Sequence, residues 1–135
     1  MFEYKEMKPS LTAYKQLFVS TGWTASISIS DEILQKVIDQ SWHWVSVFEN
    51  DLLIGVGRLV SDGGLYAFLC DMIVLPDYQN QGIGTSILGM LRAKCTEHNI
   101  QRVWLFSAPG RAPFYEKNGF MIRPENAPGM QMTQL

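Results

Sequence analysis

The sequence predicts a single-domain α/β (α+β) fold, in which helices flank one mixed, mostly antiparallel central sheet. Strand-like alternation fills the middle third of the 135 residues, and a strand–helix–strand–helix run follows it. Hydrophobic residues make up 47% of the chain and charged residues 18%, which is the balance of a globular protein. A chain of this length buries about two-thirds of its unfolded surface without disulfides or structural metal. Residues 1–135 are therefore expected to form one domain.

Charge and composition exclude several classes of partner. The chain carries 11 basic and 13 acidic side chains, for a formal net charge of -2. A nucleic-acid-binding domain is usually basic, so no nucleic-acid partner is expected. No stretch approaches the roughly 18 uninterrupted apolar residues of a membrane-spanning helix, so no membrane partner is expected. Residues 1–6 lack the apolar region of a signal peptide, and Cys70 and Cys95 lack the spacing of a disulfide framework. The chain is therefore expected to be cytoplasmic.

The N-terminal third is expected to hold a short strand at residues 2–5 and two helices. Ser10 can cap the first helix, and Ser30, followed by two acids, opens the second. The apolar positions of the first helix recur at helical spacing, at Leu11, Tyr14, Leu17 and Phe18. Those of the second helix are Ile33, Leu34, Val37 and Ile38. Each helix therefore has one face suited to packing on a sheet.

Three strands are predicted for the middle third, at residues 42–49, 52–60 and 65–75, with turns at 50–51 and 62–64. The third strand is apolar on both sides, as in a central strand covered by helices. Strict alternation puts Tyr66, Phe68, Cys70, Met72 and Val74 on one side and Ala67, Leu69 and Ile73 on the other. Asp71 is the exception in this strand, and a buried carboxylate is costly unless it has a partner.

The last third is predicted to contain a long helix at residues 82–99, a strand at 101–106 and a short helix at 111–118. The buried stripe of the long helix is Ile83, Ile87, Leu88, Leu91 and Cys95. Gly119 is expected to end the short helix in a left-handed conformation. Residues 120–122 and 130–134 are candidate closing strands.

A glycine-rich loop between the third strand and the long helix carries the strongest chemical signal. Pro76 stops the strand, and Gly82 and Gly84 open the helix. The first backbone N–H groups of a helix have no acceptor within it and point outward with the positive end of the dipole. Glycines let an anion approach these groups closely. The loop is therefore a candidate phosphate or pyrophosphate cradle.

Two nucleotide-binding motifs do not fit this loop. A Walker A loop requires Gly-Lys-Ser/Thr, whereas Gly84 is followed by Thr85-Ser86. A dinucleotide fingerprint requires a third small residue where Ile87 stands. It also requires an acid about twenty residues later, where Phe106 and Ser107 stand. Both readings therefore fail.

Two motifs in this order resemble the GNAT superfamily of acetyl-coenzyme A-dependent N-acetyltransferases. The first is Gln-x-x-Gly-x-Gly at Gln79, Gly82 and Gly84, and the second is Phe-Tyr-Glu-Lys-Asn-Gly-Phe at residues 114–120. The order of predicted elements over nearly the whole chain agrees with that family's fold. More loosely, Gly22-Trp23, residues 44–47, Arg58, residues 61–63 and Asp71 resemble the branch that contains the plastid-type serotonin N-acetyltransferases.

The resemblance implies how the cosubstrate, acetyl-coenzyme A, would be held. The cradle for its pyrophosphate would be Gln79, Asn80, Gln81, Gly82, Ile83, Gly84 and Thr85. The backbone of Met72, Ile73 and Val74 would pair with the pantetheine arm as an added strand does. The strand at residues 103–106 would splay away and open a slot for the thioester. Many relatives carry asparagine where Ala108 stands, so a hydrogen bond to the pantetheine arm is either missing here or supplied by Ser107.

The resemblance also implies transfer of the acetyl group to a primary amine by direct attack in a ternary complex. Tyr115 would act as general acid toward the leaving thiolate, although a core aromatic is the alternative role. Asp71 is either the base, directly or through water, or a structural acid bonded to a neighbour. Trp23 and Arg58 are candidate residues of the amine pocket, with packing under a helix the alternative for Trp23.

A non-catalytic coenzyme A-binding sensor or partner module is the competing interpretation. Such a module would keep the pyrophosphate loop and lose the acid and the base. The acceptor of an active enzyme is either a small-molecule amine or a peptide or protein amine. No metal is expected, because Cys95 and His98 supply only two ligands. The resemblance also suggests a homodimer.

Overall fold

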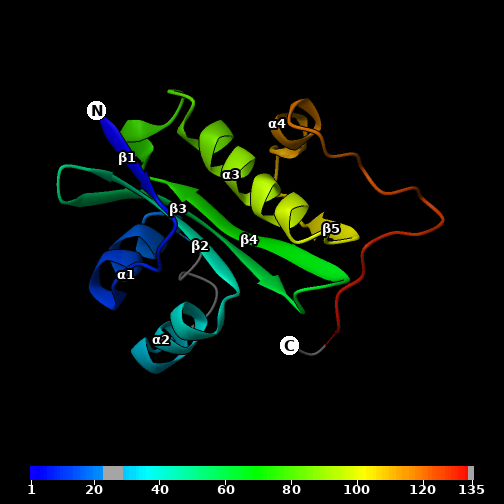
Figure 1. Ribbon diagram of the computed structural model, residues 1–135, viewed down its shortest axis with the longest axis horizontal. Helices are drawn as coiled ribbons and strands as arrows, with labels where there is room; N and C mark the ends of the chain where they lie inside the picture. Colours follow the sequence, from blue (N-terminus) through cyan, green and yellow to red (C-terminus); the bar gives the residue numbers. More distant parts are fainter. Residues whose placement is uncertain (23–28, 134–135) are drawn as a thin grey trace. The chain divides into compact units, whose positions relative to one another are not determined.

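The computed structural model describes residues 1–22 and 29–133, and its elements are labelled in Figure 1. In chain order they are β1 (Phe2–Lys5), α1 (Leu11–Val19), α2 (Asp31–Gln40), β2 (His43–Glu49), β3 (Leu52–Ser61), β4 (Tyr66–Val74), the 3-10 helix η2 (Pro76–Tyr78), α3 (Ile83–Glu97), β5 (Arg102–Leu105) and α4 (Ala112–Lys117). The chain forms two compact units, Met1–Leu105 and Phe106–Leu135. The first unit holds the whole sheet, and the second holds α4 and the segment that follows it.

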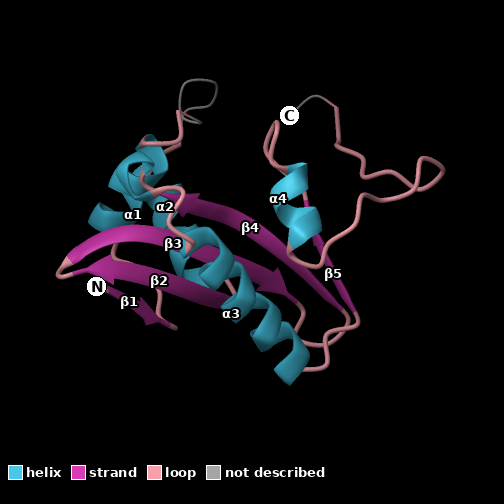
Figure 2. Ribbon diagram, turned by 90° about the horizontal axis from the view of Figure 1, so that it is seen from above, coloured by secondary structure: helices cyan, strands magenta, loops and turns pink. Residues whose placement is uncertain are grey.

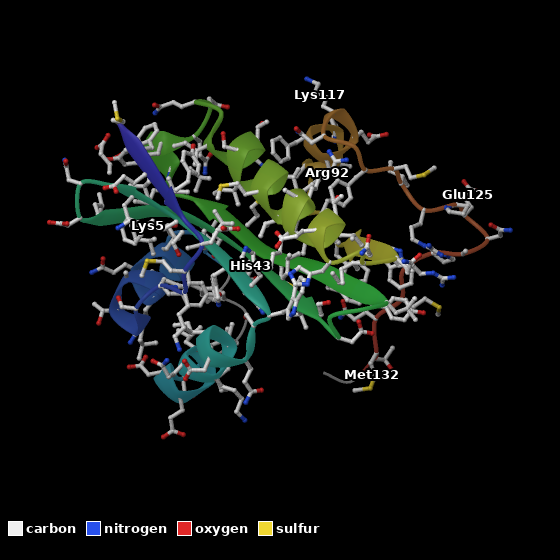
Figure 3. All side chains as sticks on the ribbon, in the orientation of Figure 1. Lys5, His43, Arg92, Lys117, Glu125 and Met132 are labelled. Carbon is white, nitrogen blue, oxygen red and sulfur yellow. The ribbon has the colours of Figure 1, made fainter. Side chains whose placement is uncertain are left out.

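The sheet of the first unit has five strands in the order β1-β2-β3-β4-β5 (Figure 1). The pairs from β1 to β4 are antiparallel, whereas β4 and β5 run parallel. A parallel pair needs a long crossover connection, and α3 supplies it. At the β1 edge, Lys5 lies over the ring of Phe48 in β2, 5.4 Å from its centroid (Figure 3). The predicted class, a mixed and mostly antiparallel sheet flanked by helices, is confirmed.

Serine caps begin α1 and α2, as predicted. The backbone N–H of Ala13 donates to Ser10 Oγ at 3.2 Å, and that of Ile33 donates to Ser30 Oγ at 3.2 Å. Each bond satisfies one of the N–H groups that a helix leaves without an acceptor in its first turn. The start of each of these two helices is therefore set by its serine cap.

Helices cover both faces of the sheet, with α1 and α2 on one side and α3 on the other (Figure 2). The core beneath α1 and α2 consists of Tyr14, Leu17, Phe18, Leu34, Ile38, Trp44, Leu53, Val56 and Ile73. Successive strand residues face opposite sides, so Gly55 and Gly57 of β3 face α3. A Cβ atom at Gly57 would lie 2.6 Å from Ile87 Cγ2. The α3 helix therefore packs directly on the backbone of β3.

A β-bulge at Asp71 divides β4 into two halves. Arg58 pairs with Cys70 and Val56 pairs with Ile73, so Gly57 alone stands opposite two residues, Asp71 and Met72. The extra residue reverses the alternation. Before the bulge, the face toward α1 and α2 carries Tyr66, Phe68 and Cys70, and the face toward α3 carries Ala67 and Leu69. After the bulge, Ile73 lies on the face toward α1 and α2, and Met72 and Val74 lie on the face toward α3. The prediction of one strict alternation along β4 is therefore wrong beyond Asp71.

In the second unit, α4 ends as predicted and the closing strands do not form. Gly119 has a φ of 93°, and the N–H of Phe120 donates to the carbonyl of Tyr115 at 3.1 Å. Residues 120–133 contain no strand, so the predicted strands at 120–122 and 130–134 are wrong over these residues. A turn between two prolines takes their place, since the N–H of Ala127 donates to the carbonyl of Pro124 at 2.9 Å.

The lengths and compositions of the helices can be compared with those of membrane-spanning helices. Within residues 1–22 and 29–133, no helix combines the length and the apolar character needed to cross a membrane.

Candidate active site

Side-chain hydrogen bonds anchor the loop that joins β4 to α3. Gln79 Nε2 donates to the carbonyl of Val74 at 3.0 Å, which closes the loop back onto the end of β4. Tyr78 Oη donates to Glu49 Oε1 at 2.7 Å, which ties η2 to the end of β2. One N–H of the Gln79 side-chain amide is therefore engaged within the loop. A ligand at this loop would meet mainly backbone groups.

The N-terminus of α3 has the form of an anion site. Gly82 is its N-cap residue, with a φ of 83° and no side-chain cap bond. The N–H of Ser86 donates to the carbonyl of Gly82 at 3.1 Å as the first bond of the helix. The N–H groups of Ile83, Gly84 and Thr85 therefore have no acceptor inside the helix. A Cβ built at Gly82 meets nothing within 4 Å, so a side chain at this position would face open space.

On the side away from β3, the edge of β4 beside this loop has no paired strand among the described residues. The parallel pairing of β4 with β5 runs from Tyr66 opposite Arg102 to Leu69 opposite Leu105. The strand β4 continues to Val74, and within the described residues no strand pairs with that side of it beyond Leu69. Met72, Ile73 and Val74 lie in this half of the strand. The strand expected to splay away at residues 103–106 instead stays paired with β4 as far as Leu105, where β5 ends, so that prediction is wrong over residues 103–105.

A polar network surrounds Asp71 at the bulge. Its Oδ2 accepts a hydrogen bond from Arg58 Nε at 2.8 Å and another from Tyr14 Oη at 3.1 Å. Arg58 Nη1 donates to Ser41 Oγ at 3.2 Å, and Ser41 Oγ donates to the carbonyl of Val37 at 2.6 Å. The side chains of Asp71 and Arg58 are only 21% and 15% exposed, so water screens this ion pair weakly.

Burial and charge shift the titration of the two donors to Asp71. Burial, followed by the Asp71 carboxylate, raises the pKa of the Tyr14 phenol well above its ordinary range. Burial by itself would lower the pKa of Arg58, but the charge of Asp71 and its hydrogen bond, with smaller contributions from Cys70 and Tyr14, together raise that pKa. Tyr14 therefore stays a donor and Arg58 stays a cation at any pH near neutrality.

Tyr115 and Ser107 belong to the second unit. Tyr115 is half-buried in α4, with ring centroids 5.1 Å from Phe114 and 6.0 Å from Phe120 in edge-to-face contacts. Burial raises the pKa of the Tyr115 phenol, and Arg111 partly opposes that rise. Ser107 lies exposed in the segment between β5 and α4. The aromatic packing is the one expected if Tyr115 were a core residue, and the phenol remains available for proton donation.

The structure brings two of the predicted site residues together. Arg58, a candidate for the amine pocket, is engaged with Asp71, and Trp23 lies outside the described residues. Tyr14 is the residue that the sequence analysis missed, because its spacing fitted the apolar face of a helix. The signal that could have found it is Asp71 itself, since a carboxylate in an apolar strand demands hydrogen-bond donors.

Metal ligation has no support in the described residues, 1–22 and 29–133. No group of three or more His, Cys, Asp and Glu side chains among them is arranged to hold a metal ion.

Known proteins resemble this chain in both sequence and structure. A family model described as an acetyltransferase (GNAT) domain matches residues 39–122. The uncharacterised N-acetyltransferase ycf52 of Gracilaria tenuistipitata var. liui is 30% identical over 123 residues, which are 86% of this chain and 64% of the relative. The chloroplastic GCN5-related N-acetyltransferase 2 of Arabidopsis thaliana is 35% identical over 78 residues, 58% of this chain and 30% of the relative. The chain spans 47% and 64% of the length of two further ycf52-type relatives, from Pyropia yezoensis and Prochlorococcus marinus.

Solved structures extend the likeness to nearly the whole chain. A probable acetyltransferase of unknown function from meticillin-resistant Staphylococcus aureus matches 98% of this chain and 99% of its own, with a TM-score of 0.86 and 24% identity. A GNAT family acetyltransferase from Streptococcus pneumoniae TIGR4 matches 90% of this chain and 89% of its own, with a TM-score of 0.74 and 28% identity. The first of these comparisons supports the fold, and the second supports fold and family together. With the family model matching more than half of its residues, the chain belongs to the GNAT superfamily of N-acetyltransferases.

Proposed function

We propose that the chain transfers an acetyl group from acetyl-coenzyme A to a primary amine. The observation that carries the proposal is the N-terminus of α3. Its first N–H groups lack helical acceptors, and Gly82 lies left-handed beside open space. A pyrophosphate matches such a set of donors in charge and in geometry. The GNAT family uses acetyl-coenzyme A as its cosubstrate, so the pyrophosphate of that molecule is the natural occupant.

The edge of β4 that faces away from β3, beyond Leu69, supports a role in holding the rest of the cosubstrate. The backbone of Met72, Ile73 and Val74 would bind the pantetheine arm as an added strand, on the side away from β3, where no strand of the described residues pairs with β4 beyond Leu69. Ser107 would donate or accept one further hydrogen bond to that arm. A backbone N–H near Ile73 would polarise the thioester carbonyl.

The reaction requires one nucleophilic attack and two proton transfers, one from the incoming ammonium and one to the leaving thiolate. The amine nitrogen attacks the thioester carbonyl carbon, and the carbon–sulfur bond then breaks. Tyr115 donates a proton to the leaving thiolate, and a raised phenol pKa keeps that proton in place at neutral pH. The incoming ammonium must first lose a proton, to Asp71 or to water. Because Asp71 Oδ2 already accepts from Arg58 and Tyr14, its contacts favour water as the acceptor.

A thiol-release assay with a panel of amines tests the activity. Arylalkylamines, polyamines and short peptides with free N-termini or lysines are each incubated with the protein and acetyl-coenzyme A. We expect turnover with at least one class, and the class that reacts identifies the acceptor as a small amine or a peptide amine. Micromolar binding of coenzyme A with no turnover on any amine would instead favour a non-catalytic sensor.

A pair of glycine variants tests the location of the cosubstrate. Gly82→Asp puts a carboxylate beside the proposed pyrophosphate, and we expect the affinity for coenzyme A to fall at least tenfold, or about 1.4 kcal/mol. Gly63→Asp is the matched control, because Gly63 has a similar φ of 79° in the β3–β4 turn and a Cβ there would make only an ordinary contact, 3.8 Å from Trp42 Nε1. Equal affinities in two folded variants, measured by calorimetry, would refute the proposed site.

A further inference from the structure

The backbone of Asp71 is unusual for a strand residue. Among the described residues, four that are not glycine have a positive φ. Asn50, Asn80 and Asn99 are asparagines in turns or loops, where that conformation is common. Asp71, with a φ of 48°, lies inside β4. A left-handed residue in a strand is strained, and it persists only where its surroundings hold it.

Three separate elements hold the Asp71 side chain. Tyr14 comes from α1 and Arg58 from β3, and both donate to the same oxygen of Asp71, at 3.1 and 2.8 Å. Ser41, the C-cap residue of α2, accepts from Arg58 at 3.2 Å. Tyr14 is fully buried at 0% exposure, so its hydroxyl group cannot turn to solvent instead. The carboxylate is therefore held from the side of α1 and α2.

The bulge at Asp71 determines which face of the sheet each of the following residues points to. The bulge reverses the faces of β4, so that Ile73 enters the core and Met72 turns to the side of α3. Without the extra residue, Met72, Ile73 and Val74 would present the opposite set of side chains and backbone groups to each neighbour. These are the residues whose backbone would bind the cosubstrate.

We propose that Tyr14 and Arg58 are positioning residues that hold Asp71 in its left-handed conformation and so orient the backbone of Met72 and Ile73 toward the thioester. Asp71 acts through the strand and is not the proton acceptor. The catalytic half of this inference rests on the proposed acetyltransferase function. The structural half concerns the free protein and is tested without any substrate.

Nuclear magnetic resonance of the ligand-free protein tests the structural half. The variants are Tyr14→Phe and Arg58→Lys, and the control is Tyr4→Phe, which removes a phenol oxygen from β1. A left-handed residue has a downfield Cα chemical shift and an extended strand residue an upfield one. We expect the Asp71 Cα signal to move upfield in both network variants and to stay in place in the control. An unchanged Asp71 signal in both folded network variants overturns the inference.

Kinetics with the acceptor found in the amine panel test the catalytic half. We expect Tyr14→Phe to lower kcat at least fivefold and to lower the affinity for coenzyme A by a smaller factor, because the cradle at α3 is unchanged. The acidic limb of the pH–rate profile should keep its position in Tyr14→Phe and in Asp71→Asn, because neither change removes the base. If Asp71→Asn abolishes that limb and Tyr14→Phe turns over like the parent, then Asp71 is the base and the inference is wrong. A parent protein that acetylates no amine refutes the proposed function and the catalytic half together, and the Asp71 shift still decides the structural half.

Discussion

Replacing Gly57 with alanine tests how α3 is held on the sheet, and therefore how the cradle at its N-terminus is placed. The new methyl group would lie 2.6 Å from Ile87 Cγ2 and 2.8 Å from Leu91 Cδ1. Ordinary contacts between carbon atoms are about 3.5–4.0 Å. Both neighbours are fully buried, and the β-branched side chain of Ile87 is stiff at χ1. The side chains cannot move aside, so α3 has to shift outward by about 1 Å.

The magnitude follows from two opposing effects. Overpacking a core costs about 1–3 kcal/mol, and alanine is favoured over glycine within a strand by about 0.5–1 kcal/mol. The net loss in the free energy of unfolding is therefore about 1–2 kcal/mol. For a domain of this size that loss corresponds to a fall in Tm of roughly 4–8 °C. Because the cradle moves with α3, we also expect the affinity for coenzyme A to fall by about threefold to tenfold.

Thermal and urea unfolding of Gly57→Ala and Gly89→Ala give the comparison. Gly89 lies in α3 with nothing within 4 Å of a Cβ, so alanine there should stabilise the helix by about 0.8–1.0 kcal/mol. It should also leave the affinity for coenzyme A unchanged. A Tm for Gly57→Ala at or above that of the parent would mean that α3 does not pack on β3 as described.

Three further predictions concern single side chains. Tyr115→Phe should lower turnover by roughly 10² to 10³ with little change in Tm. It should also remove the alkaline limb of the pH–rate profile, which is expected above pH 10 because burial raises the phenol pKa. Turnover within threefold of the parent would contradict the role of Tyr115 as an acid. Backbone N–H groups of Gly64, Tyr66 and Leu65 lower the pKa of Asp62, so stability should fall as pH drops below about 4, and Asp62→Asn should flatten that fall in urea titrations. Burial, with Lys94 adding to it, lowers the pKa of His43. The unfolded chain therefore binds a proton there more readily, and stability should decline below about pH 6.5 in the parent but less steeply in His43→Phe.

Local chemistry accounts for the parts of the fold that could be predicted from sequence. Ser10 and Ser30 cap helices whose first turns lie within three residues of them. Gly119 adopts the left-handed conformation expected at the end of a helix. In each case the signal and the structure it specifies are neighbours in the chain, so no tertiary information is needed.

The closing strands show where local chemistry is insufficient. Residues 120–122 and 130–134 have apolar side chains suited to strands, but a strand needs a paired neighbour as well as propensity. The segment between them contains Pro124 and Pro128, which cannot donate ladder hydrogen bonds. Arg123 Nε instead donates to the carbonyl of Ala127 at 2.9 Å, which holds a turn.

The faces of β4 could not be predicted by periodicity, because both of its faces are apolar. In a strand with one polar face, an extra residue would expose apolar side chains, and the pattern would show it. In β4 the shift exchanges one apolar set for another, so the pattern carries no trace of the bulge. Asp71 is the one residue of β4 that could not lie on either apolar face without a hydrogen-bond donor. Its carboxylate requires donors, and the chain offers 11 lysines and arginines. The hairpin register selects Arg58, which stands opposite Cys70, and the packing of α1 adds Tyr14, 57 positions away in the chain. A lone carboxylate in a doubly apolar strand is therefore the place to expect a bulge, and an arginine on the adjacent hairpin strand is the first partner to test.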